Sequence, residues 1–302
     1  MEFFDNHAHY DDEKFNEDRE EIIKEIYESG VTKVISAGYS LEGSKKALEL
    51  AKKYDFIYST AGISPNDIPG DGLDEENLIT KTDSEKEEIF AKSIQEFQEQ
   101  LKEIENLAQD KKVVAIGEIG LDYYWNKQNK EIQKHVFIQQ IELANKLNLP
   151  IVIHTRDAIM DTLEILKNIK KPIKPGVFHC CPLNVELVKE AIKLGFYISC
   201  AGPVTFKNSK NAREVVELIP LDKILIETDS PYLAPEPVRG TRNDSRNVKY
   251  TAQKIAEFKN MPLEDIAKAT YENALRVFDI KWFRGFRGHP PKTAWKFSCC
   301  FW

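Results

Sequence analysis

Cysteine is scarce in this sequence, with five in 302 residues, and no two form a Cys-x-x-Cys pair. This scarcity excludes a disulfide framework and argues against a thiolate metal site. The first residues lack a basic stretch followed by a long apolar run, so no signal peptide is expected. No run of about 18 apolar residues occurs, which argues against a membrane-spanning helix. We therefore expect a reduced, cytoplasmic protein that has no membrane partner.

The sequence also lacks an excess of basic residues, because 42 Lys and Arg face 49 Asp and Glu. Residues 281–302 hold five basic residues and no acid, so residues 1–280 carry a formal net charge of −12. An acidic body argues against sequence-independent nucleic-acid binding through bulk charge. A phosphate-bearing substrate would have to be held by local cations or by metal ions.

Short β-branched runs alternate with longer amphipathic segments along residues 1–280. Eight strands are expected, at residues 3–4, 31–36, 56–60, 113–116, 151–153, 177–178, 196–199 and 224–226. Eight helices are expected between and after them, at about 13–29, 41–53, 85–109, 129–148, 157–169, 184–194, 210–219 and 246–259. Eight such units in about 280 residues predict a closed (β/α)₈ TIM barrel. An open doubly wound sheet is the alternative, although no Gly-rich phosphate loop follows the first strand.

No linker interrupts residues 1–280, so a single domain is expected there. Residues 66–88 are expected to be the longest irregular segment, and they are strongly acidic. Residues 281–302 depart from the pattern, because they hold three of the four tryptophans and have no clear period. A basic, aromatic nucleic-acid tail is one interpretation. We favour an artefactual extension, such as a fusion scar or an altered reading frame.

Four of the six histidines and two acidic residues fall at or just past the ends of expected strands. They are His7, His9, Glu118, His154, His179 and Asp229. In a barrel, strands distant in sequence end on one rim, so these side chains would converge at one mouth. Four imidazoles and two carboxylates can bind two divalent cations if one carboxylate bridges them. The donor set favours Zn, Mn, Fe or Co, whereas Mg prefers oxygen ligands, so the identity of the cations is left open.

Several longer segments carry a resemblance to a known family. They are Asp5-Asn6-His7-Ala8-His9, Gly117-Glu118-Ile119-Gly120-Leu121-Asp122, Ile153-His154-Thr155-Arg156-Asp157-Ala158, Phe178-His179-Cys180, Gly202-Pro203-Val204-Thr205-Phe206-Lys207-Asn208, Glu227-Thr228-Asp229-Ser230-Pro231-Tyr232-Leu233-Ala234-Pro235 and Arg239-Gly240-Thr241-Arg242-Asn243. Over nearly the whole of residues 5–278 the chain resembles the TatD-like metal-dependent deoxyribonucleases of the amidohydrolase superfamily. The resemblance implies a TIM barrel that hydrolyses phosphodiester bonds in DNA with divalent cations. It further implies that His7, His9, Glu118 and Asp229 surround one cation, and that Glu118, His154 and His179 surround the second.

On this interpretation two cations would share a bridging water and lower its pKa toward neutrality. Glu118 would act as the bridging ligand and Asp229 as the general base. Glu227, two residues before Asp229, would orient a ligand from behind the site or bond to the backbone. DNA would be the substrate, as a single strand or at its 3′ ends, with 3′–5′ exonuclease action as one form of the activity.

Candidate substrate contacts surround these ligands in the sequence. Arg156 follows the ligand His154 by two residues, and its guanidinium suits a bidentate phosphate contact. Ser64 and Asn66 stand where the family often has two histidines, and their side chains can hydrogen-bond a phosphate. The remaining candidates lie after the seventh and eighth expected strands, and are Lys207, Asn208, Arg239, Arg242 and Asn243.

Two other functions remain open at this point. The same barrel could hydrolyse another bond, such as an ester on aminoacyl-tRNA; a cyclic amide is disfavoured because Glu118 stands where many amidohydrolases have a carbamylated Lys. A metal-binding scaffold without catalysis is the second alternative. Fold alone does not choose among these functions.

Overall fold

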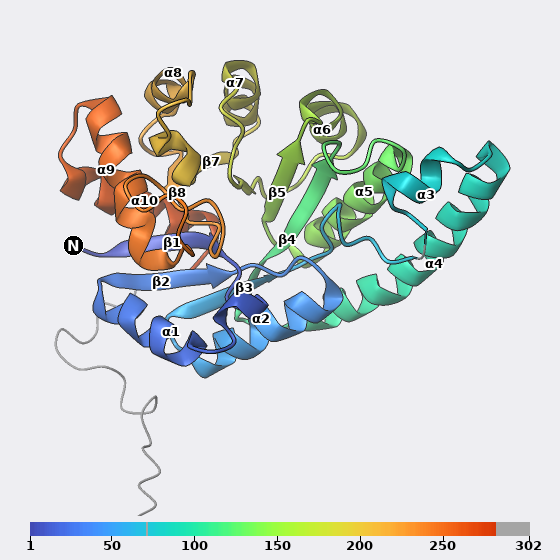
Figure 1. The fold of residues 1–302 in the computed structure, drawn as a ribbon, viewed down its shortest axis with the longest axis horizontal. Helices are drawn as coiled ribbons and strands as arrows, with labels where there is room; N and C mark the ends of the chain where they lie inside the picture. Colours follow the sequence, from blue (N-terminus) through green and yellow to red (C-terminus); the bar gives the residue numbers. More distant parts are fainter. Residues whose placement is uncertain (71, 282–302) are drawn as a thin grey trace, which may run out of the picture.

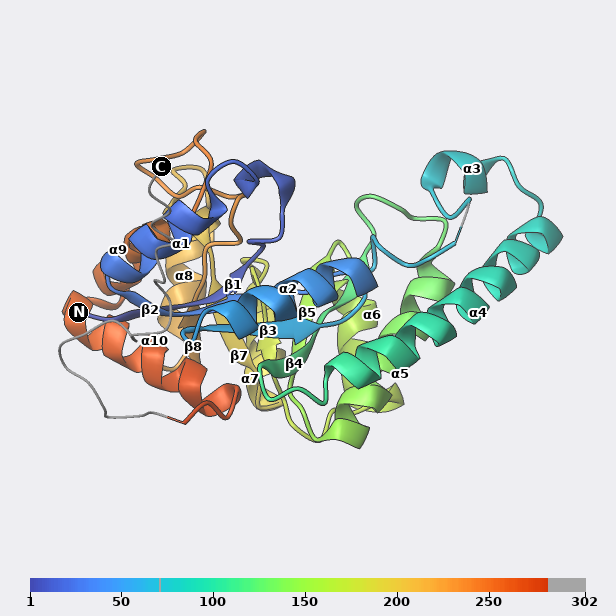
Figure 2. The same cartoon turned by 90° about the horizontal axis from the view of Figure 1, so that it is seen from below.

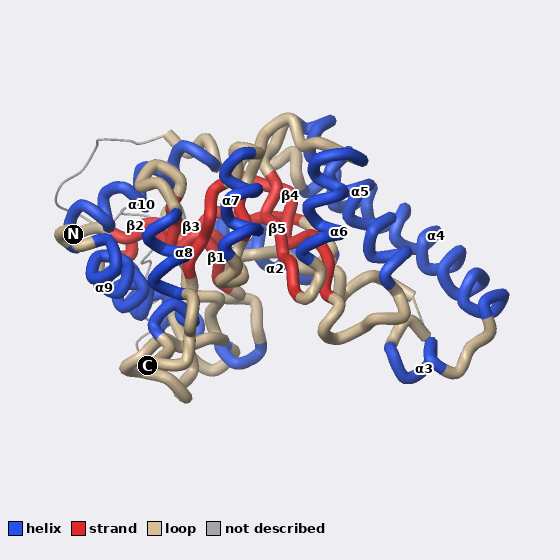
Figure 3. The backbone as a smooth tube through the Cα atoms, turned by 90° about the horizontal axis from the view of Figure 1, so that it is seen from above, coloured by secondary structure: helices blue, strands red, loops and turns tan. Residues whose placement is uncertain are grey.

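The structure is a computed structural model that describes residues 1–70 and 72–281. At its centre is one sheet of eight strands in the order β1 to β8, and every neighbouring pair is parallel. Helices surround these strands (Figures 1 and 3). The strands are β1 (Phe3–Ala8), β2 (Val31–Ser36), β3 (Ile57–Ala61), β4 (Val113–Asp122), β5 (Ile151–Arg156), β6 (Val177–Phe178), β7 (Tyr197–Cys200) and β8 (Ile224–Ile226). The TIM barrel is therefore confirmed, and the open doubly wound sheet is wrong, because that fold reverses its strand order.

The barrel is nearly closed, and its seam lies between β1 and the segment that follows β8. One isolated parallel bridge joins Ala8 to Ser230. The backbone N–H of Asp229 donates to the carbonyl of His7 at 2.9 Å, and that of His9 donates to Ser230 at 2.7 Å. Backbone pairing across the seam thus involves the residues around three of the expected metal ligands.

The helices fill the connections between strands. They are α1 (Arg19–Glu28), α2 (Leu41–Lys53), α3 (Glu75–Ile79), α4 (Asp83–Leu107), α5 (Lys130–Leu147), α6 (Ile159–Glu164), α7 (Val185–Lys193), α8 (Ala212–Leu218), α9 (Val248–Lys259) and α10 (Leu263–Val277). Two of them were not predicted, namely α3 and α10. The segment 66–88 is less irregular than expected, because it holds α3 and the start of α4. These two helices extend from the barrel on the side away from α9 and α10 (Figure 2).

Several helices begin where a side chain caps the first turn, as their sequences require. Ser40 Oγ accepts the N–H of Gly43 at 3.0 Å before α2. Thr82 and Glu85 form a capping box at the start of α4, in which each side chain accepts the other's backbone N–H. Such a cap contributes about 1 kcal/mol to helix stability. It lets α4 begin within a charged segment and bury Phe97 and Ile104 further along its length.

One apolar cluster fills the end of the barrel where the strands begin. Each strand contributes to it, through Phe4, Ile35, Tyr58, Val114, Val152, Val177, Tyr197 and Leu225. The C-terminal helix α10 covers this end, because the Phe4 ring lies 5.8 Å from that of Tyr271 and 6.4 Å from that of Phe278 just beyond the helix. The opposite end, where the strands finish, is left for polar side chains.

Lys112 stabilises the start of β4 and gives the first testable prediction. Its Nζ donates to the backbone carbonyls of Tyr54, Asp55 and Ile57, at 3.1, 3.0 and 2.8 Å. Replacing Lys112 by Met should lower the free energy of unfolding by about 2 kcal/mol, because three charge-assisted hydrogen bonds are lost. Urea unfolding followed by circular dichroism measures the change. Lys111→Met, at the exposed neighbouring position, is the matched control, and equal stability of the two variants would contradict the prediction.

Two further sequence-based expectations concern membrane-spanning helices and residues 281–302. Among the described residues, no helix is both long and apolar enough to cross a membrane. Of residues 281–302, interpreted as an artefactual tail, 282–302 lie outside the residues that the structure describes. The boundary of the domain near residue 280 therefore stays a prediction.

Candidate metal centre

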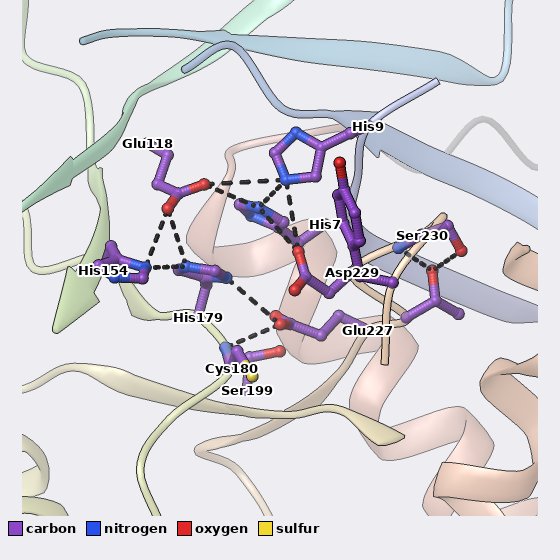
Figure 4. Close-up of polar contacts among 12 residues, drawn as sticks. His7, His9, Glu118, His154, His179, Cys180, Ser199, Glu227, Asp229 and Ser230 are labelled. Atoms are coloured by element: carbon purple, nitrogen blue, oxygen red, sulfur yellow. Dashed lines mark hydrogen bonds and ion pairs between the residues drawn. The ribbon is translucent and has the colours of Figure 1, made fainter. Parts of the chain in front are cut away.

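The six expected ligands meet at the C-terminal ends of the strands (Figure 4). They come from five strands that are far apart in the sequence. His7 lies in β1, Glu118 in β4 and His154 in β5. His9, His179 and Asp229 follow β1, β6 and β8 within three residues. The barrel thus places all six side chains in one cluster.

Four ligand atoms form the first half of this cluster, which we call group A (His7, His9, Glu118 and Asp229). Oε2 of Glu118 lies 3.3 Å from Nε2 of His7 and 3.8 Å from Nε2 of His9. Oδ1 of Asp229 lies 3.8 Å and 3.3 Å from the same two nitrogens. The two imidazole nitrogens are 3.2 Å apart.

The second half, group B, consists of Glu118, His154 and His179. Oε1 of Glu118 lies 3.0 Å from Nδ1 of His154 and 3.3 Å from Nε2 of His179. The two imidazole nitrogens are 3.2 Å apart. Glu118 therefore belongs to both groups, with one carboxylate oxygen turned toward each (Figure 4).

These distances fit metal coordination better than they fit ordinary hydrogen bonding. Ligand atoms at about 2.1 Å from a tetrahedral ion are separated by about 3.4 Å, close to the spacings seen in both groups. Two pairs of imidazole nitrogens would also repel if both nitrogens carried protons. The residues present therefore fit divalent-cation binding by nitrogen and oxygen donors, and three overlapping groups of them have ligand atoms within 4.8 Å of one another.

The charges of the site suit cations as well. Burial disfavours ionisation of Glu118, but the imidazoles of His179, His154 and His7 outweigh it and hold the pKa of its carboxyl well below the usual range. Burial is likewise outweighed at Asp229, whose pKa is lowered chiefly by His9. Burial lowers the pKa of His9, but the carboxylates of Asp229 and Glu118 raise it overall, to about 9. The lowered pKa values keep both carboxylates ionised at neutral pH, so each can serve as an anionic ligand of a divalent cation.

Glu227 lies behind group B, where it contacts a ligand from the protein side. Its Oε1 accepts the backbone N–H of Cys180 at 2.7 Å and lies 3.4 Å from Nδ1 of His179. Its side chain is fully buried. Because Nδ1 of His179 faces this carboxylate, Nε2 is the nitrogen that faces Glu118.

Asp122 was not predicted as a site residue. It contacts the imidazole of His154 from the protein side, as Glu227 contacts that of His179. Oδ2 of Asp122 lies 2.9 Å from Nε2 of His154, so that Nδ1 of this ring is turned toward group B. Asp122 is the last residue of β4 and only 1% exposed. Its position four residues after Glu118 in a strand is the signal that could have indicated it, because strand residues at even spacing share a face.

Asp5 is a second residue that was given no role. Its carboxylate accepts the backbone N–H and the hydroxyl of Thr228, at 2.9 and 2.5 Å, and the hydroxyl of Ser245 at 2.5 Å. Burial raises the pKa of this carboxyl to about 7, although those hydrogen bonds act to lower it. Asp5 thereby ties β1 to the segment that carries Asp229, across the seam of the barrel.

The expected substrate contacts divide into two sets. Arg156, Arg239, Lys207 and Asn208 are exposed. The polar atoms of the other set are engaged within the protein. Ser64 donates to Asp67 at 2.5 Å, Asn66 to Asp122 at 3.2 Å, and Arg242 to both carboxylate oxygens of Asp18, while buried Asn243 donates to the carbonyls of Thr228 and Tyr232.

Comparison with known proteins places this arrangement among relatives. A family model described as "TatD related DNase" matches residues 4–279. The chain is 43% identical to an uncharacterized metal-dependent hydrolase of Bacillus subtilis, YabD, over 92% of this chain and 99% of the relative. It is 33% identical to another, YcfH of Escherichia coli, over 93% and 97% of the two chains. The crystal structure of YjjV, a TatD homologue from E. coli, superposes with a TM-score of 0.77 at 26% identity, and covers 92% of this chain and 98% of its own.

Proposed function

The chain belongs to the TatD related DNase family of metal-dependent hydrolases, and from that premise we propose that it hydrolyses phosphodiester bonds in DNA. The observation that carries the proposal is the carboxylate of Glu118, which turns one oxygen toward each of two imidazole pairs. A carboxylate placed in this way would hold two cations as close together as two-metal hydrolysis of phosphate esters uses them. The two bound cations would lower the pKa of a water and neutralise charge that develops on the phosphate oxygens.

Asp229 is the proposed general base. Its Oδ1 lies at the edge of group A, next to Nε2 of His9. Its lowered pKa keeps the carboxylate ionised at neutral pH. It can therefore accept a proton from an attacking water without first losing one of its own.

Phosphate groups flanking the scissile bond would be held by local cations, because the protein as a whole is acidic. Arg156 and Arg239 are exposed, and each stacks on an aromatic ring, with the guanidinium carbon 3.7 Å from the centroid of Tyr124 and 4.1 Å from that of Phe206. Lys207 and Asn208 follow Phe206 directly. We propose these four residues as the phosphate contacts, and propose that the polar atoms of Ser64, Asn66, Arg242 and Asn243 support the surrounding loops.

We further propose that the enzyme works in a reducing compartment such as the cytoplasm. The thiols of Cys180, Cys181 and Cys200 are all free. Burial raises the pKa of the Cys200 thiol to about 12, which keeps it protonated and unreactive.

Cleavage of end-labelled single-stranded DNA tests the proposed activity. Protein treated with a chelator should be inactive, and Mg, Mn, Co or Zn added back in turn should restore a ladder of products that shortens from the 3′ end. Inactivity before metal addition is expected because the cluster then lacks the cations that would lower the pKa of the attacking water. Absence of cleavage with all four metals would overturn the nuclease proposal and direct the search to ester substrates such as aminoacyl-tRNA.

A further inference from the structure

Two large aromatic side chains are exposed beside the metal centre. Tyr124 and Trp125 lie two and three residues after the end of β4, and their side chains are 51% and 63% exposed. Their ring centroids are 4.9 Å apart, with an interplanar angle of 88°. Aromatic rings of this size are mostly buried in proteins, so adjacent exposed ones at the mouth of a barrel indicate a contact surface.

Arg156 completes this surface from the end of the neighbouring strand β5. Its guanidinium carbon lies 3.7 Å from the ring centroid of Tyr124 and 5.6 Å from that of Trp125. The side chain of Arg156 is exposed, and no ion pair of it with a carboxylate is found among the described residues. Its guanidinium therefore lies against the rings with N–H donors that a ligand can reach.

The same carboxylate that orients His154 also fixes the aromatic pair. Oδ1 of Asp122 accepts the backbone N–H groups of Tyr124 and Trp125, at 2.9 and 3.2 Å. Its Oδ2 lies 2.9 Å from Nε2 of His154 in group B. One buried side chain thus anchors both the backbone that carries the two exposed rings and a histidine of the metal centre.

A depression of about 520 Å³ adjoins the surface. Arg156, Tyr123, Lys130 and Met160 contribute to its lining. Nζ of Lys130 lies 4.4 Å from the ring centroid of Tyr123, so a second cation lines the depression, together with the carboxylates of Asp157 and Asp161. This volume lies within the range of about 300–1,000 Å³ that small-ligand sites occupy. A flat apolar ring with flanking cations is the chemistry that recognises a nucleobase and its phosphate.

We infer that Tyr124, Trp125 and Arg156 form a subsite on which one unpaired nucleobase of the substrate stacks. The inference rests on the proposed function, because it places this base next to the phosphate that group B would hold. Base stacking on an aromatic ring tolerates any base, so the subsite would position a strand without reading its sequence. A base inside a duplex has both faces covered, so only an unpaired base can use the subsite.

Variants of Trp125 test the subsite by activity. The full chain is assayed on dodecathymidylate and on methyl 4-nitrophenyl phosphate, a phosphodiester without a base. Trp125→Leu should lower kcat/KM on the oligonucleotide about tenfold and leave hydrolysis of the small diester unchanged, since base–aromatic stacking is worth about 1–3 kcal/mol. Trp125→Phe should restore most of the loss. Tyr27→Leu, at an exposed tyrosine near the start of β2, is the control and should match the wild type on both substrates.

The small diester separates a stacking role from a structural one. An equal loss on both substrates would mean that Trp125 acts through Asp122 on the metal centre, and would overturn the inference. An unchanged kcat/KM on the oligonucleotide would overturn it as well.

Binding without turnover separates failure of the subsite from failure of the proposed nuclease activity. Fluorescence anisotropy measures the Kd of labelled dodecathymidylate for the metal-free protein. We expect Trp125→Leu to raise this Kd about tenfold, and we expect no such difference on a strand of abasic nucleotides. If the wild type cleaves neither substrate, the nuclease proposal fails, while this Kd still decides the subsite. No binding by the wild type, or the same Kd in both proteins, would overturn the subsite.

Discussion

Replacing Glu118 by Gln should reduce hydrolysis by at least about 10³-fold and lower the metal content of the protein. The carboxylate is shared by groups A and B, so its loss removes one ligand from each. Even the loss of an outer partner of a metal ligand costs about 10–100-fold, and a shared ligand should cost more. Metal content by plasma mass spectrometry and cleavage of labelled single-stranded DNA measure the two effects.

The control for Glu118 is the same change at Glu49, an exposed residue of α2. Glu49→Gln should keep wild-type metal content and rate. If Glu118→Gln also retained two cations per chain and full activity, the bridging role assigned to this carboxylate would be wrong.

Asp229→Asn should lower kcat by about 10² to 10⁴-fold, the range expected when a positioned general base is removed. The amide has the shape of the carboxylate but cannot accept a proton at neutral pH. Asp229 is also a member of group A, so the assay is made at saturating metal to separate its two roles. Asp55→Asn, at an exposed position before β3, is the control. Full recovery of the rate in excess metal would limit Asp229 to metal binding.

The order and number of the strands could be predicted, but not where three of them end. The apolar runs stop before His7, Glu118 and His154, so the strands were expected to stop there too. The backbone ladders continue beyond these residues, and Asp122 pairs with Arg156 at the ends of β4 and β5. Ladder hydrogen bonds use backbone groups, so a polar side chain needed at the mouth does not terminate a strand.

The helix α10 was missed for a different reason. Its stripe of Ile266, Ala267, Tyr271 and Ala274 is a clear helical pattern. A (β/α)₈ barrel needs eight helices, and eight were already predicted without this segment. The role of α10 is to cover the open end of the barrel, and that need becomes visible only when the eight strands are assembled around Phe4 and its neighbours.

The candidate ligands could be named from the sequence because each one lies at or shortly after the end of an apolar run. The residues that contact the candidate substrate-binding residues could not be named from the sequence, because they come from distant parts of the chain. Arg242 looks like a phosphate-binding residue in its own segment, yet its guanidinium meets Asp18, 224 positions away. Asp122 has its partner, His154, 32 positions away, and only the pairing of β4 with β5 brings the two together.

The seam of the barrel means that the two halves of the site cannot be completed at the same moment during synthesis. Group B needs only β4 to β6, and its two histidines are 25 positions apart. Group A joins the first strand to the segment after the last one, where Asp5 meets Thr228 across 223 positions. All three ligands of group B are therefore synthesised before Asp229, the last member of group A. Group A is therefore complete only after the segment that follows the last strand has been synthesised.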